Sequence, residues 1–231
     1  MSEFSSRVVL VAGASGALGS AVTAAFRREG ATVVAVARSI TAPEAGEEGV
    51  IPVHADLTTS QGAQAAVAET LRQAKRLDAL IHVMGGFAGG QPVNETPEET
   101  WDQMMNLNLR AAFLVARAVL EPMLEARRGR IVAVGSRTGV EPAAGVGAYG
   151  VSKAGLNALI QTIAKEVQGK GITANVVLPS TIDTAANRKA MPDADASQWV
   201  KPESIARLIV WLCSDAAADT SGALIPIYGQ A

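Results

Sequence analysis

The sequence predicts an α/β fold in which one parallel sheet is covered by helices on both faces. Short, almost wholly apolar runs recur along the chain, as expected for strands that are buried on both sides. Segments with helical spacing of apolar residues separate these runs, so strands and helices alternate. The 231 residues are 48% hydrophobic and 18% charged, which suits one large domain over residues 1–231.

The first half of the chain supplies four predicted strands. Val8–Ala12 is entirely apolar and stops at a glycine-rich turn, after which a helix runs to about Glu29 and ends at Gly30. Further apolar runs predict strands at 31–37, 50–54 and 78–83, with an alanine-rich helix at 60–75 between the last two.

The second half supplies three more strands. After a glycine-rich loop at 85–90, a helical region from 96 to about 128 is expected to form two helices. Strands are predicted at 130–134, 172–178 and 223–227, with helices at 148–167 and 202–214 and an irregular or short-helical stretch at 179–201. Seven parallel strands with right-handed crossovers form a doubly wound sheet, which binds ligands at the carboxyl ends of its strands.

Composition excludes several function classes. The net charge of −2, without a basic run, argues against nucleic acid as a partner, and no stretch is apolar enough to predict a membrane span. The single cysteine, Cys213, fits a reducing cytoplasm, and two histidines do not make a metal site with it.

The first turn carries a phosphate-binding pattern. Gly13, Gly16 and Gly19 follow the first strand and open the first helix, where backbone N–H groups and the helix dipole favour an anion. A tight turn that needs glycine for geometry alone is the alternative. The order of strand, glycines and helix favours a dinucleotide-binding Rossmann domain.

The ends of the second and third strands bear on which dinucleotide binds. An acidic residue after the second strand would select NAD, but this chain has Ala37-Arg38. Arg38 can form charge-assisted bonds to the 2′-phosphate of NADP, unless it is an ordinary surface arginine. Asp56 and Leu57 are candidates for contact with adenine, although Asp56 would also suit a turn cap.

Tyr149 and Lys153 are four residues apart on a predicted helix and therefore share one face. A nearby ammonium favours the phenolate and lowers the pKa of a tyrosine, which could then exchange a proton with a carbonyl or hydroxyl group. The spacing alone favours an unremarkable helix start with a solvated lysine.

Together with the glycine turn, Asn108, Ser136, Tyr149 and Lys153 occur in an order that resembles the short-chain dehydrogenase/reductase family over nearly the whole chain. The resemblance implies that Tyr149 is the general acid/base, that Lys153 lowers its pKa and binds the nicotinamide ribose, and that Ser136 polarises the substrate oxygen. Asn108 would position a water that links Lys153 to solvent.

The resemblance also implies the cofactor contacts, with Thr184 holding the nicotinamide carboxamide. The implied set is Gly13, Ser15, Gly16, Leu18, Gly19, Arg38, Asp56, Leu57, Gly85, Lys153, Pro179, Ile182 and Thr184. The chain departs from the family at Ala17, where a glycine is usual, and at 82–85, where His-Val-Met-Gly replaces Asn-Asn-Ala-Gly.

The substrate loops resemble those of quinonoid dihydropteridine reductases at 85–90 and 178–199. Ser136 and Ala37-Arg38 instead resemble a carbonyl reductase. Phe87 and Trp199 become candidate walls for a flat or apolar substrate, with Trp199 alternatively a core anchor.

We therefore expect a cytoplasmic NADP-dependent oxidoreductase that transfers hydride between NADPH and a carbonyl or alcohol, with a substrate loop at about 180–201 and a homotetrameric or homodimeric assembly. A dihydropteridine-reductase-like enzyme is the first alternative. A non-catalytic dinucleotide-binding sensor is the second.

Overall fold

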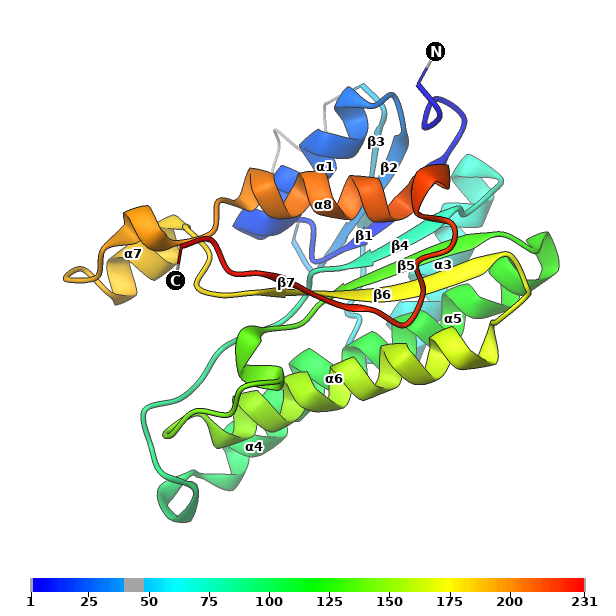
Figure 1. Cartoon of the computed structure of the whole chain (residues 1–231). Helices are drawn as coiled ribbons and strands as arrows, with labels where there is room; N and C mark the ends of the chain where they lie inside the picture. Colours follow the sequence, from blue (N-terminus) through cyan, green and yellow to red (C-terminus); the bar gives the residue numbers. More distant parts are fainter. Residues whose placement is uncertain (1, 40–47, 231) are drawn as a thin grey trace.

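The computed structural model describes residues 2–39 and 48–230 (Figure 1). Its sheet has seven parallel strands in the order β3-β2-β1-β4-β5-β6-β7, which confirms the predicted fold class. The strands are β1 (Val8–Ala12), β2 (Thr32–Ala37), β3 (Val50–His54), β4 (Ala79–His82), β5 (Gly129–Val134), β6 (Ile172–Pro179) and β7 (Leu224–Ile227).

Helices cover both faces of the sheet. Helices α1 (Ala17–Arg28) and α8 (Pro202–Cys213) lie on one face, and α3 (Ser60–Ala74), α5 (Ala111–Ala126) and α6 (Gly147–Glu166) lie on the other (Figure 1). The shorter helices are α4 (Glu98–Met104), α7 (Ala185–Ala190) and the 3₁₀ turns Val93–Glu95, Arg137–Gly139, Ala196–Gln198 and Asp215–Ala217. None of the helices within 2–39 and 48–230 has the length and apolarity to cross a membrane.

Each strand contributes to two separate cores because successive side chains point to opposite faces of a sheet. In β1, Val9 and Val11 pack under α1 and α8, while Leu10 and Ala12 pack under α5 and α6. This arrangement explains why the central strands are apolar throughout.

Parallel pairing brings the residues that follow the strands to one edge of the sheet. These carboxyl ends face toward α7 in Figure 1. The glycine turn after β1, Arg38 after β2, Gly85 after β4 and Ser136 after β5 therefore lie along the same edge.

The helical region at 96–128 differs from the prediction of two separate helices. Helix α4 continues without a break through a π-helical segment, Met105–Arg110, into α5. The extra residue that a π-helical turn accommodates changes the direction of side chains without a loop, and such segments are frequent at functional sites.

Candidate active site

Lys153 lies on the buried face of α6, under the carboxyl end of β5. Its side chain is 5% exposed, and its Nζ donates to the backbone carbonyl of Val134 at 2.9 Å. Burial lowers the pKa of Lys153 to about 8, because the ammonium loses hydration that one carbonyl only partly replaces. A negatively charged or hydroxyl group placed beside the ammonium would therefore supply hydrogen bonds that the protein does not.

Tyr149 lies one helical turn before Lys153, and its hydroxyl shares a hydrogen bond with the Ser136 side chain that lowers the tyrosine pKa. Burial has the larger effect and raises that pKa above its usual value. The expectation that Lys153 would lower the Tyr149 pKa is thus wrong for this structure, because desolvation of the phenolate dominates.

Ser136 follows β5 by two residues and caps the turn Arg137–Gly139, where its hydroxyl accepts from Thr138 N–H at 3.2 Å. Asn157, one turn beyond Lys153 on α6, donates to the carbonyl of Gly139 at 3.2 Å. The same helix therefore carries Tyr149 and Lys153 and holds the turn that positions Ser136.

Asn108 lies fully buried in the π-helical segment, where its side chain joins the β4 loop to α6. Its Oδ1 accepts from Gly86 N–H at 2.9 Å, and its Nδ2 donates to the Gly86 carbonyl at 3.1 Å and to Ser152 Oγ at 3.0 Å. Ser152 donates in turn to the carbonyl of Tyr149 at 2.7 Å. The side-chain amide is thus engaged with protein groups, and the role of Asn108 in positioning a water stays a prediction.

From the sequence, Ser152 was not identified as a site residue. Its one indication was position, since Ser152 lies three residues after Tyr149 and so within one helical turn of it. Gly85 lies where the loop, Asn108 and Lys153 meet, because a Cβ on it would stand 2.6 Å from Asn108 Oδ1 and 3.3 Å from Lys153 Nζ. A side chain at position 85 would therefore disturb both groups.

His82, the last residue of β4, is buried near enough to Lys153 for the charge of the lysine to act on it. Neither ring nitrogen has a hydrogen-bond partner among the described residues. Burial, with a further contribution from the charge of Lys153, lowers the pKa of His82 to about 3. The imidazole is therefore neutral at pH 7.

The glycine turn has the geometry of a phosphate cradle. Gly13 has φ of +93° and approaches the Met84 backbone so closely that a Cβ would lie 2.8 Å from it, while Gly19 packs against Gly13 and Ala14. Gly16 is different, since its φ is −80° and a Cβ would have 3.6 Å of clearance.

Neither backbone strain nor crowding requires glycine at position 16. Because few atoms lie near Gly16, space remains in front of the first turn of α1. The helix begins without a side-chain cap and without an acidic residue in its first turn, which leaves its first N–H groups available to an anion. Ser15, Gly16 and Ala17 are exposed there, whereas Leu18 is buried. The turn fits a dinucleotide phosphate.

Arg38 and Asp56 follow neighbouring strands, are both exposed, and lie close enough for the charge of Arg38 to lower the Asp56 pKa slightly. The main causes of that lowered pKa are hydrogen bonds from the hydroxyl and backbone N–H of Thr58, so Asp56 does cap a turn. Leu57 is buried in the core under α3 and α5, so its side chain does not face an adenine at the edge, contrary to expectation.

The 180–201 segment is built around a parallel bridge between Ile182 and Val200. Thr184 caps α7 by accepting from Asn187 N–H, and Arg188 forms an ion pair with Asp183 at 2.6 Å. Pro179 ends β6 next to this segment, whereas Trp199 is half-buried at its far end.

Phe87 is 69% exposed, and its ring meets that of Tyr149 edge to face, with 5.0 Å between centroids. A small pocket of about 80 Å³ lies between the loop after Phe87 and the start of α6, and is lined by Ala88, Gly89, Gln91, Thr96, Thr100 and residues 145–148. The structure therefore brings together Gly85, Phe87, Asn108, Ser136, Tyr149 and Lys153.

Comparison with known proteins gives a consistent result. The family model described as short chain dehydrogenase matches residues 7–195. The 3-oxoacyl-[acyl-carrier-protein] reductases FabG of Thermotoga maritima and Pseudomonas aeruginosa are each 31% identical, with 96% of each chain covered. D-threitol dehydrogenase of Mycolicibacterium smegmatis is also 31% identical, over 96% of this chain and 92% of that protein.

Solved structures agree on the fold. An oxidoreductase of the short chain dehydrogenase/reductase family from Burkholderia thailandensis has a TM-score of 0.86 and 32% identity, covering 96% of this chain and 91% of its own. ElxO with NADP bound has a TM-score of 0.91, 21% identity and coverage of 96% and 97%.

The buried His82 makes stability sensitive to acid. Its pKa of about 3 in the folded protein lies below the value near 6.5 of an unfolded histidine, so the unfolded chain binds more protons as the pH falls. We expect the His82→Asn variant to lose part of the decline in unfolding free energy between pH 6.5 and 4, measured by urea denaturation. His54→Asn, at the exposed second histidine, serves as control, and an unchanged pH dependence in His82→Asn would contradict the assignment.

Proposed function

Because the chain belongs to the short-chain dehydrogenase/reductase family and is an oxidoreductase, we propose that it transfers hydride between NADPH and a carbonyl or alcohol substrate. The convergence of Ser136, Tyr149 and Lys153 at the carboxyl edge of the sheet is the observation that carries this proposal. The family binds a nicotinamide dinucleotide, so a sensor without activity is not needed to explain these residues.

The three side chains divide the work of the reduction. A nicotinamide dinucleotide held at this edge would supply the hydride, and the substrate oxygen would then carry developing negative charge. Tyr149 donates its proton to that oxygen, and Ser136 donates a hydrogen bond to the same atom. Once the proton has left, the Lys153 ammonium one helical turn away would be the cation available to the phenolate, whose formation burial otherwise disfavours.

Three groups of residues would hold the dinucleotide. The open start of α1, with Gly13, Ser15, Gly16 and Gly19, takes the pyrophosphate, and Leu18 supports that turn from below. Asp56 and Arg38 flank the adenosine end, while Gly85 and Lys153 lie at the nicotinamide end. Pro179, Ile182 and Thr184 complete that end from the substrate loop at about 180–201.

The preference for NADP rests on Arg38. No acidic side chain stands at positions 37 and 38, and the exposed guanidinium lies beside Asp56 at the edge where the ribose would sit. The guanidinium would pair with a 2′-phosphate.

A second candidate substrate is a flat ring such as a quinonoid pterin. The exposed Phe87 ring beside Tyr149 favours it, because an aromatic wall suits a planar substrate. Trp199 would form a further wall from the substrate loop.

We also propose that the protein acts as a homodimer or homotetramer. Trp101, Phe113 and Val151 are large apolar side chains on α4, α5 and α6 that are 43%, 43% and 50% exposed. A second copy of the chain would cover these exposed side chains.

Removing the Arg38 guanidinium should erase most of the cofactor preference. In Arg38→Ala we expect NADPH affinity to fall roughly 10- to 100-fold, the loss of a charge-assisted bond, with NADH affinity nearly unchanged. Fluorescence titration of both cofactors measures this. Equal affinities for NADPH and NADH in the wild type would contradict the proposal.

Removing the Tyr149 hydroxyl should stop proton delivery while leaving the ring in place. We expect Tyr149→Phe to reduce turnover roughly 100-fold or more, with NADPH affinity retained. Tyr228→Phe, at the only other tyrosine, should keep its activity. Near-normal turnover in Tyr149→Phe would show that another group is the acid.

The Ser136→Ala variant separates the two substrate classes. A carbonyl oxygen needs the Ser136 hydrogen bond as charge develops, so carbonyl reduction should fall severely, whereas a quinonoid pterin nitrogen should need it less. Steady-state rates on both substrate types provide the comparison. A large loss with pterins and none with carbonyls would reverse the assignment.

A further inference from the structure

A second cavity, of about 520 Å³, opens at the amino edge of the sheet. It lies between the end of α6, the start of β6 and the loop that follows α8. Ser136 follows the opposite end of β5 and Pro179 is the last residue of β6, whose eight residues span roughly 25 Å. The cavity is therefore separate from the active site, and its volume is in the range of small-molecule sites.

Two side chains in its wall, Arg130 and Thr173, are register partners on β5 and β6 and point to the same face of the sheet. They are 9% and 5% exposed, and neither Arg130 Nε nor Thr173 Oγ1 has a hydrogen-bond partner among the described residues. Unpaired buried polar atoms are uncommon in folded proteins, and two neighbouring ones beside a cavity suggest a missing partner.

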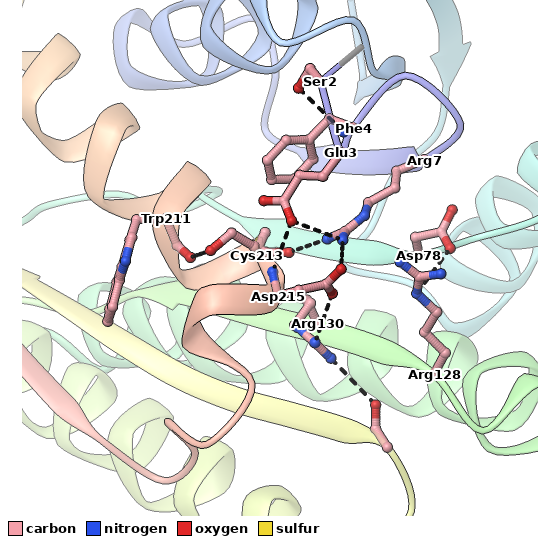
Figure 2. Close-up of polar contacts among 12 residues, drawn as sticks. Ser2, Glu3, Phe4, Arg7, Asp78, Arg128, Arg130, Trp211, Cys213 and Asp215 are labelled. Atoms are coloured by element: carbon pink, nitrogen blue, oxygen red, sulfur yellow. Dashed lines mark hydrogen bonds and ion pairs between the residues drawn. The ribbon is translucent and has the colours of Figure 1, made fainter.

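The charge of Arg130 is only partly neutralised. Its Nη1 donates to the carbonyls of Gly129 and Gly171, while its Nη2 lies 3.6 Å from Asp215. Figure 2 shows that Arg7 points at the same carboxylate, which it meets at 2.8 Å. Two buried guanidinium groups thus share Asp215, which is itself 65% exposed.

The remaining wall adds donors more than acceptors. Ser221 Oγ accepts from Ala174 N–H at 3.1 Å, which leaves its own O–H free to donate into the cavity. Lys165 adds a second cation, and Asp219 is the one acidic lining residue within the part of the chain that the structure describes. Asp219 and the carbonyl end of α6 oppose an anion, so the affinity should be modest.

We propose that this cavity binds the phosphate group of a small molecule, with Arg130, Thr173, Ser221 and Lys165 as its donors. A tetrahedral phosphate has an oxygen for donors arriving from several sides, as they do here, whereas a carboxylate presents only two oxygens in one plane. The bound phosphate would give Arg130 the counter-charge that it shares with Arg7 at present.

The test is calorimetric titration with inorganic phosphate at constant ionic strength, with the protein saturated in NADPH so that the glycine turn and Arg38 are occupied. We expect one phosphate per chain. Thr173→Val should weaken it at least fivefold, and Lys165→Ala should weaken it as well. Thr23→Val is the matched control, because Thr23 is also buried with an unpartnered hydroxyl but lies on α1, outside the cavity lining.

Absence of binding to the wild type, or equal binding by Thr173→Val and Thr23→Val, would overturn the proposal. A second subunit that covers the cavity would give the first of these results. Repeating the titration without NADPH separates this site from the cofactor site: phosphate heat that disappears only when NADPH is added belongs to the cofactor site and counts against the proposal.

Discussion

The side-chain amide of Asn108 connects three segments that meet only in the folded chain. It pairs with both backbone groups of Gly86 and, through Ser152, reaches the carbonyl of Tyr149. The loop after β4, the π-helical segment and the first turn of α6 are therefore held at fixed distances. A buried amide with these hydrogen bonds made is rigid, since breaking any one of them would leave a polar atom unpaired in the interior.

Both ends of β5 carry a buried cation, and the two are treated differently. At the start, Arg130 donates to two backbone carbonyls and shares the Asp215 carboxylate with Arg7. At the end, Lys153 has the Val134 carbonyl, and its pKa falls to about 8. An arginine keeps its charge under such conditions, whereas a lysine becomes able to lose it, so only the carboxyl end has a cation whose charge can respond to its surroundings.

The fold could be predicted from sequence because parallel strands buried on both faces are apolar throughout and end at glycines or polar turns. The same logic located the glycine turn, Arg38 and Ser136, since the residues after parallel strands share one edge. Apolar pattern does not show which way a single side chain turns after a strand ends. The core position of Leu57 was therefore beyond it, whereas the turn cap at Asp56 was an alternative that the sequence left open.

Other parts of the site depend on tertiary contacts. Ser152 has a role only because Asn108 lies opposite, and the pKa of His82 falls to about 3 because the folded chain buries the ring. The direction in which the Tyr149 pKa shifts depends on the balance between burial, which raises it, and the Ser136 hydrogen bond, which lowers it. Spacing along a helix does not reveal that balance.

The π-helical segment makes the length of the helical region part of the geometry of the candidate site. Each residue of an α-helix turns the chain by about 100°. The wider π-helical turn absorbs one extra residue, so α4 and α5 keep the phase in which they pack. Deleting one residue between 105 and 110 would restore a regular α-helix and leave α4 and α5 nearly in phase, but the residues of the segment would change direction. Asn108 would then no longer face Gly86 and Ser152. The continuous helix 98–126 should therefore tolerate many substitutions on its surface but no insertion or deletion within 105–110.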